Sequence, residues 1–292
     1  MGKLTVNQKI SLCEFRQNLS DKSDYVNAKG LAKKLTAIRL LVGMVIGAAV
    51  WRTICGFSII RKFAGQTISL TGFNKKIGCL QFNLLPVVCC PGATPECKRL
   101  GYCVAAVRQY KNVEAAYRKN YEAIIADITG FVTAFVSALG EYVKAGGQFF
   151  RFHSYGDFFS QAYLNACFEV ARRVPSLRYL AHTKSFWMDY SQKPENFTII
   201  FSLFPDSNID GILTAAKKWG FKLAFAGSPE DYAHNQEAFY LATKAVICSG
   251  NCGSCGNKCW AAEVEFIDGS VRFPWHGTDA LAAKKSKKAG RK

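Results

Sequence analysis

Two groups of cysteines, far apart in the chain, hold seven of its twelve cysteine residues. They are Cys90, Cys97 and Cys103, and then Cys248, Cys252, Cys255 and Cys259. Thiols at this density bind zinc or iron–sulfur clusters in a reducing compartment, or pair as disulfides in an oxidising one. The first 34 residues alternate charged and polar side chains and contain no apolar core of a secretory signal. We therefore expect a cytoplasmic protein whose thiols are reduced and bind metal.

The first group has the spacing Cys90-x6-Cys97-x5-Cys103. Three thiolates on a loop suit a four-iron cluster that leaves one iron open to a substrate or cofactor, or a zinc ion completed by another ligand. Buried free thiols are the structural alternative, because cysteine is often buried in protein cores. The turn residues Pro91 and Gly92 argue against that alternative, since a loop turn offers little packing.

The second group places four cysteines within twelve residues, among Gly250, Gly253 and Gly256. Glycine adopts positive φ readily, which suits the tight turns around a metal. Four thiolates can saturate one zinc ion or one cluster and so form a closed site. His276 could replace one of the four cysteines as a ligand.

The hydrophobic pattern predicts the elements that must position these groups. Apolar runs predict strands at residues 149–153, 177–182, 197–201, 222–226 and 245–247, and helical spacing predicts helices at 113–128, 131–144, 158–173 and 209–219. Strands at intervals of roughly 20 to 28 residues with helices between them are typical of parallel βα units. We predict an α/β fold, either a parallel sheet or a partial (β/α) barrel, with cysteine-rich metal-binding loops.

Polar residues follow each predicted strand. The carboxyl ends of parallel strands meet along one edge of a sheet, and active sites are built there. We expect catalytic or acid–base roles for His153, Asp157, His182 and Lys184. We expect cofactor-binding roles for Ser154, Gly156, Thr183 and Ser202. Because the last strand runs directly into Cys248, the pattern predicts one site shared with the cysteines.

The formal charge of +17 favours binding to polyanions, of which nucleic acid is the commonest in cytosol. Part of this charge lies in the tail at residues 284–292, which is too polar to fold alone. A solvated basic surface with a solubilising tail is the alternative.

Residues 40–51 form an apolar segment, and Arg52 interrupts its continuation to residue 60. A bilayer span needs roughly 20 unbroken apolar residues, so we expect a buried or interfacial helix and no firm membrane association. The predicted parts are an N-terminal helical extension at 1–65, a cysteine-rich α/β metal-binding core at 66–276, and a basic disordered tail at 277–292.

Several motifs in order resemble a bacteriophage family. They are LTGFNKKIG (70–78), FNLLP (82–86), CPGAT (90–94), RFHSYGDF (151–158), SQAY (160–163), AHTKS (181–185) and the late Cys252, Cys255 and Cys259-Trp260. Together they resemble the gene product eighty-eight family, which implies a phage or phage-derived protein acting in the host cytoplasm. Five residues separate Cys97 from Cys103, where that family usually has about three.

The layout of this family is similar to that of radical S-adenosylmethionine proteins. The shared features are an early three-cysteine loop, the turn Gly156-Asp157 after a strand, a parallel sheet and an accessory cysteine cluster. The resemblance implies one or two four-iron clusters, with S-adenosylmethionine as cofactor, in an enzyme that modifies nucleic acid or nucleotides. A zinc-containing, transglycosylase-like enzyme with Asp157 as catalytic carboxylate is a second hypothesis. A non-catalytic nucleic-acid-binding protein with structural metal sites is a third.

Overall fold

The computed structural model describes residues 59–63, 66–74, 76–100, 102–252, 255–256, 258–260 and 270–275 of the 292-residue chain. These residues build a nine-stranded sheet in the order β1-β2-β3-β4-β5-β6-β7-β9-β8. Its strands are β1 (Ile59–Phe63), β2 (Gln66–Asn74), β3 (Cys79–Phe82), β4 (Phe149–Phe152), β5 (Arg178–Thr183), β6 (Phe197–Leu203), β7 (Lys222–Ala226), β8 (Val246–Ile247) and β9 (Val271–Phe273).

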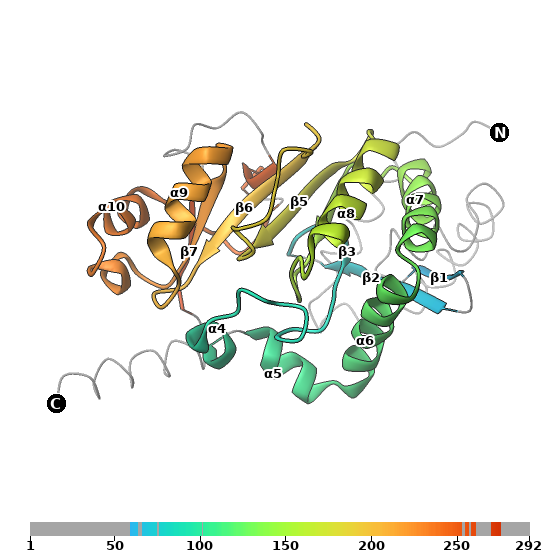
Figure 1. The fold of residues 1–292 in the computed structure, drawn as a ribbon, viewed down its shortest axis with the longest axis horizontal. Coiled ribbons are helices and arrows are strands. Elements are labelled where there is room, and N and C mark those ends of the chain that lie inside the picture. The colour runs from blue at the N-terminus through green and yellow to red at the C-terminus, as the bar shows by residue number, and fades with distance from the viewer. Residues whose placement is uncertain are drawn as a thin grey trace, which may run out of the picture.

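The described residues also form seven helices and two 3-10 turns. They are α4 (Pro95–Leu100), α5 (Tyr102–Gln109), α6 (Lys111–Ala126), α7 (Ile128–Lys144), α8 (Gln161–Arg173), α9 (Ile209–Trp219) and α10 (Gln236–Lys244), with 3-10 turns η2 (Pro229–Tyr232) and η3 (Lys258–Trp260). The strands from β3 to β9 are all parallel, whereas β1 and β2 pair antiparallel. Right-handed crossovers between neighbouring strands place successive helices on the same side. Figure 1 shows α8 and α9 in front of the sheet in this way.

Aromatic side chains fill the core between the sheet and the helices. Phe135 of α7 stacks on Phe152 of β4 with ring centroids 5.6 Å apart, and meets Phe82 of β3 edge-on at 5.0 Å. The covering helices begin and end where their sequence provides caps. The Ser160 side chain accepts a hydrogen bond from the Tyr163 amide at the start of α8, and Gly220 ends α9 in the left-handed conformation.

The opposite face, here called the inner face, carries a different set of side chains. Residues paired across parallel strands point to the same side of a sheet. Gln81, Arg151 and Leu180 are paired in this way across β3, β4 and β5. Trp260 of η3 packs on this face together with Leu180, in an apolar cluster separate from the helix-side core.

The sheet curls around its inner face. The rings of His182 on β5 and Phe273 on β9 lie 5.7 Å apart, although β6 and β7 separate these two strands. In a flat sheet, three strand spacings would hold them about 14 Å apart. The prediction of an α/β fold with a parallel sheet is therefore confirmed, and its curvature is that of part of a barrel.

Most predicted elements occur within a few residues of their expected positions. Helix α9 and strand β7 have the predicted bounds. Within the predicted extension at 1–65, the described residues Ile59–Phe63 form a strand whose Ile59 pairs with Leu70 of β2, and residues 1–58 lie outside the described residues. The apolar segment 40–51 and the basic tail lie outside the described residues. Within the described ranges, no helix is long and apolar enough to cross a membrane.

Candidate functional site

The first cysteine group lies beyond the carboxyl end of β3, the first strand of the parallel set. Cys90 follows in a loop, Cys97 lies in α4 and Cys103 lies in α5. Figure 1 shows α4 and α5 beyond the carboxyl ends of the central strands. The sequence-based expectation that this group lies at the carboxyl edge agrees with this placement.

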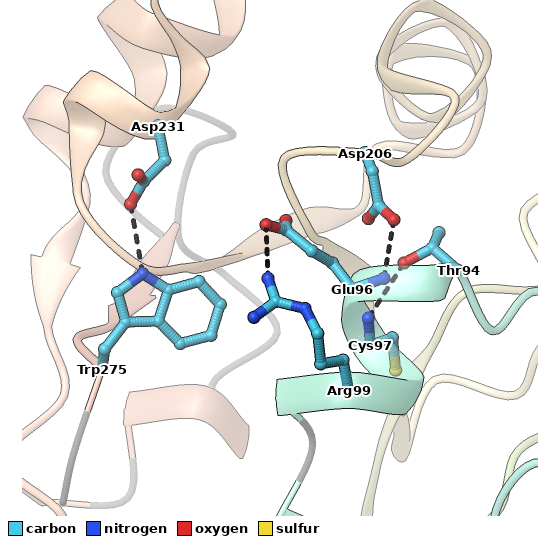
Figure 2. Close-up of polar contacts among 7 residues, drawn as sticks. All are labelled: Thr94, Glu96, Cys97, Arg99, Asp206, Asp231 and Trp275. Carbon is cyan, nitrogen blue, oxygen red and sulfur yellow. Dashed lines mark hydrogen bonds and ion pairs between the residues drawn. The ribbon is translucent and has the colours of Figure 1, made fainter. Parts of the chain in front are cut away.

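Two contacts hold α4 in place. The Thr94 hydroxyl oxygen accepts a hydrogen bond from the Cys97 amide at 3.1 Å. The Asp206 carboxylate, in the loop that follows β6, accepts one from the Glu96 amide at 2.7 Å (Figure 2). Glu96 also forms an ion pair with Arg99 at 3.3 Å. Cys97 is thus fixed beside the carboxyl end of β6.

The loop that carries Cys90 lies directly against the carboxyl end of β5. A Cβ atom on Gly92 would lie 2.7 Å from both the Cβ and the carbonyl oxygen of Lys184, so only glycine fits here. Burial raises the pKa of the Cys90 thiol, and the nearby Asp157 carboxylate and Cys103 thiol raise it further. Burial and Cys97 likewise raise the pKa of Cys103, whereas Lys184 lowers it. The Cys103 thiol is thus close enough to act on the pKa of Cys90, and the Cys97 thiol is close enough to act on the pKa of Cys103.

Asp157 joins the ends of β4 and β5. One carboxylate oxygen accepts hydrogen bonds from the Thr183 hydroxyl at 2.5 Å and the Phe158 amide at 2.7 Å. The other accepts one from the Lys184 amide at 2.8 Å. Burial raises the pKa of Asp157, while these hydrogen bonds and Lys184 oppose the rise. Both oxygens are engaged by the protein, so Asp157 and Thr183 act here as a tie between strand ends.

Asn83 makes the corresponding tie between β3 and β4, and sequence reasoning did not assign it a role. Its side-chain oxygen accepts hydrogen bonds from the amides of Ser154 at 2.8 Å and Tyr155 at 3.1 Å. Gly156 has a φ of +86° and packs against Leu84, where a Cβ would lie 2.6 Å from the leucine Cβ. The predicted cofactor residues Ser154 and Gly156 thus lie at the carboxyl edge, within this junction.

His153 points into the helix-side core and not toward the inner face. Its φ of +59° turns the side chain into the helix-side core, where Nε2 lies 2.9 Å from the Tyr163 hydroxyl. The ring also meets Phe158 edge-on at 4.7 Å. Burial, aided by the Arg151 charge, lowers the pKa of His153 to about 3. The structure therefore does not bring His153 together with the other predicted site residues.

His182 and Ser202 lie on strands that line the inner face, and Arg151 is one of the charged residues on this face. Burial lowers the pKa of His182 well below its usual value, and the cations of Arg151 and Lys184 lower it further. The same guanidinium lowers the pKa of the Cys252 and Cys259 thiols. The Arg151 charge therefore lowers the pKa of His182 at one end of the inner face and the pKa of the late cysteines at the other end. Its Nε atom is buried and has no hydrogen-bond partner among the described residues.

The late cysteine group lies at the opposite, amino-terminal end of the inner face. The Cys252 amide donates to the carbonyl of Lys76, just before β3, at 2.8 Å. The ammonium of Lys222, at the start of β7, donates to the Lys258 carbonyl at 3.3 Å. The prediction of one site shared by all the cysteines is therefore wrong in its placement of this group. After Cys248 the chain turns back along the inner face instead of staying at the carboxyl edge.

The thiols of the late cysteine group nevertheless lie close to one another. Burial raises the pKa of Cys252 to about 11, and the next largest influence is the Cys259 thiol. Cys248 and Cys255 raise the pKa of both of these cysteines. Their chemistry fits a soft metal or an iron–sulfur cluster. As the described side chains stand, however, no three His, Cys, Asp or Glu residues are placed to hold a metal ion together. His276 lies outside the described residues.

The fold and this site define a parallel α/β protein with a curled sheet and cysteine-rich loops at both ends of its inner face. The chain belongs to the Gene product 88 family, whose model matches residues 61–218. It is similar to the Gene 88 protein of Mycobacterium phage L5, with 33% identity over 131 residues, which are 41% of this chain and 54% of that protein. The Gene 88 protein of Mycobacterium phage D29 is 30% identical over the same shares.

The chain thus spans about half the length of these two curated relatives. No solved structure matches the chain significantly.

Proposed function

We propose that this phage-family protein binds an iron–sulfur cluster through Cys90, Cys97 and Cys103, and acts on nucleotides or nucleic acid at the carboxyl edge of its sheet. The observation that carries the proposal is the placement of three cysteines, one from a loop and two from helices, beyond the carboxyl edge, with the charge of Lys184 acting on two of them. Active sites of parallel α/β proteins are built at this edge.

The order of the parts supports a likeness to radical S-adenosylmethionine proteins. The cysteine loop directly follows the first strand of the parallel set, the Gly156-Asp157 turn follows the second, and a further cysteine group follows β8. A four-iron cluster with one open iron would supply one-electron chemistry to a bound cofactor such as S-adenosylmethionine. This likeness is an analogy of layout.

The residues of this chain would prepare the thiols for binding. Cysteine must lose its proton to ligate a metal, and burial opposes that loss at Cys90 and Cys103. Lys184 favours the thiolate at both positions, as Arg151 does at Cys252 and Cys259. Loading would also require the described side chains to turn toward a common centre.

The charge of the chain supports a polyanionic substrate. A net charge of +17 would attract nucleic acid over long range, and each neutralised phosphate releases counterions. The transglycosylase-like hypothesis receives less support, because all the hydrogen bonds of Asp157 described above tie the carboxylate to its own chain.

The test is anaerobic purification of the full chain, followed by analysis of iron, acid-labile sulfide and zinc. We expect iron and sulfide in the wild-type protein and less iron in Cys90→Ala. The neighbouring Cys89→Ala is the matched control, because Cys89 is fully buried in the helix-side core. Equal iron in the two variants, or zinc without sulfide in the wild type, would contradict the assignment.

The late cysteines are tested separately. We propose that they form a closed metal site, by either a second cluster or zinc. Replacing Cys252 and Cys255 with serine should then lower bound metal and the free energy of unfolding together, because a closed site contributes to folding. Unchanged metal content in this double variant would refute that role.

The substrate class is tested by titrating the full chain with DNA and RNA at rising salt. Affinity should fall steeply with salt, and removal of residues 284–292 should weaken binding without changing the metal content. No detectable binding at low salt would argue for a small-molecule substrate.

A further inference from the structure

We propose that an aromatic rim at the carboxyl edge binds a single nucleotide unit, with its base against Trp275 and Phe204 and its phosphate at Lys184. The aromatic rim is defined as Lys184, Phe204, Phe273 and Trp275. The proposal deepens the proposed function and rests on it for the location of the chemistry. It names the ligand as a planar base that carries a phosphate.

The rim places rings and a cation side by side. The ammonium of Lys184, just after β5, lies over the Phe204 ring, 4.7 Å from its centroid. The Phe204 ring, just after β6, lies 5.8 Å from the Trp275 ring, just after β9, at an angle of 56°. Phe273 meets His182 at 5.7 Å. All these side chains are partly exposed, so ring surface is available to a ligand.

Trp275 is held by a specific contact. Its indole N–H donates to the Asp231 carboxylate at 3.2 Å, and the same carboxylate oxygen accepts from the Ser228 amide at 2.7 Å. Figure 2 shows this pair beside α4, the helix that carries Cys97. A ring fixed before the ligand arrives loses little rotamer entropy on binding. This anchoring suits a stacking platform.

The charges of the rim favour a phosphate at Lys184. Within the described ranges, no carboxylate oxygen forms an ion pair with the Lys184 ammonium. The buried Asp157 carboxylate interacts electrostatically with Lys184, but both of its oxygens already accept hydrogen bonds from the protein. Asp206 accepts the Glu96 amide, and Asp231 accepts the Ser228 amide and the Trp275 indole. Arg151 adds a further positive charge on the inner face next to His182.

A site that has both aromatic rings and a cation binds a whole nucleotide more tightly than it binds the base or the phosphate alone. Stacking of a base on an aromatic side chain contributes about 1–3 kcal/mol and tolerates any base, since every base has a π-face. A phosphate alone would gain nothing from the rings, and a bare base would gain nothing from the ammonium. The rim sits beside the Cys90 loop, because Lys184 contacts Gly92. A nucleotide bound there would lie next to the first cysteine group.

The experiment titrates the full chain with 5′-AMP, adenosine, ribose 5-phosphate and a single-stranded oligonucleotide. We expect 5′-AMP or the oligonucleotide to bind more tightly than either half-ligand. Trp275→Ala should weaken binding about 5- to 150-fold, which corresponds to one lost base stack. Trp187→Ala is the matched control, because Trp187 is exposed and packs on Phe186 instead of the rim. Lys184→Gln should weaken binding of 5′-AMP and leave adenosine unchanged.

The outcomes distinguish the source of the nucleotide and the two proposals. If only the oligonucleotide binds, and its binding depends on Trp275, the rim is a site for single-stranded nucleic acid. If 5′-AMP binds, the rim is a site for a free nucleotide. Equal affinity of the Trp275→Ala and Trp187→Ala proteins for the ligand that the wild type binds would overturn the inference. So would measurable binding of 5′-AMP and ribose 5-phosphate with equal affinity, or no binding of any ligand.

Phe204→Leu provides a second variant in case Trp275→Ala fails to fold, and it should weaken binding in the same direction. Iron is measured on the same samples. Nucleotide binding without cysteine-dependent iron would refute only the proposed cluster, and iron-loaded protein that binds no nucleotide would refute only the rim.

Discussion

Replacing His153 with asparagine should change how stability depends on pH. His153 is buried in the helix-side core, and burial lowers its pKa from 6.5 to about 3. As the pH falls below 6.5, the unfolded chain binds a proton at this histidine while the folded protein does not. The folded state therefore loses stability relative to the unfolded state as the pH falls between these two values. Asparagine removes this titration and tolerates the positive φ of this position.

The size of the effect follows from linkage. One proton bound only by the unfolded chain changes the free energy of unfolding by about 1.4 kcal/mol per pH unit. Across the window from 6.5 to about 3, the loss approaches about 5 kcal/mol. The pKa of His182 is also lowered, so His182 too reduces stability as the pH falls. The pKa of Asp157 is raised, so Asp157 increases stability as the pH falls. Both remain in the two proteins, so the difference between the profiles isolates His153.

Urea denaturation at a series of pH values measures this difference. Between about pH 6.5 and about pH 4.5, the wild type should lose about 2 kcal/mol more than His153→Asn. Parallel profiles would mean that His153 takes up its proton in the folded state as readily as in the unfolded chain. That result would refute the buried, neutral role and return His153 to the candidates for acid–base chemistry.

Three substitutions at the carboxyl edge make further predictions, each measured by chemical denaturation. Gly92→Ala should lower the unfolding free energy by about 1–3 kcal/mol and reduce bound metal, because its Cβ would clash with the backbone of Lys184. Gly140→Ala is the control: its Cβ would meet no atom within 4 Å, so this change should be neutral or stabilising. Asp157→Asn should cost about 1–3 kcal/mol, since its amide nitrogen cannot accept a hydrogen bond, and a neutral result would show that this tie is dispensable. Asn83→Ala should cost at least about 2 kcal/mol by removing the acceptor of two backbone amides, and an unchanged denaturation midpoint would contradict that role.

The regular elements were predictable because their signals are local. Helix α9 shows apolar residues at helical spacing and ends at Gly220, and β7 is a compact apolar run. The placement of the Cys90 loop at the carboxyl edge followed from the parallel arrangement of the strands. These features need no knowledge of distant contacts.

Other parts of the site depend on contacts that the sequence does not reveal. His153 continues an alternating strand pattern, but its positive φ reverses the direction of its side chain. The late cysteines follow β8, which has only two residues, so nothing local indicates that the chain turns back toward Lys76. Phe273 ends a strand of three residues, too short for a periodic signal, and so part of the rim was missed.

The side chains of Asn83 and Asp157 connect neighbouring strand ends at the carboxyl edge, and separate contacts anchor α4 beside them. Both side chains bond backbone amides of neighbouring strand ends, so the ends of β3, β4 and β5 are already ordered in the folded protein. Helix α4 is six residues long, and Thr94 and Asp206 cap its first turn. The entropy of ordering the strand ends is lost on folding. A ligand that binds at this edge therefore meets strand ends and a short helix that are already held in place before it arrives.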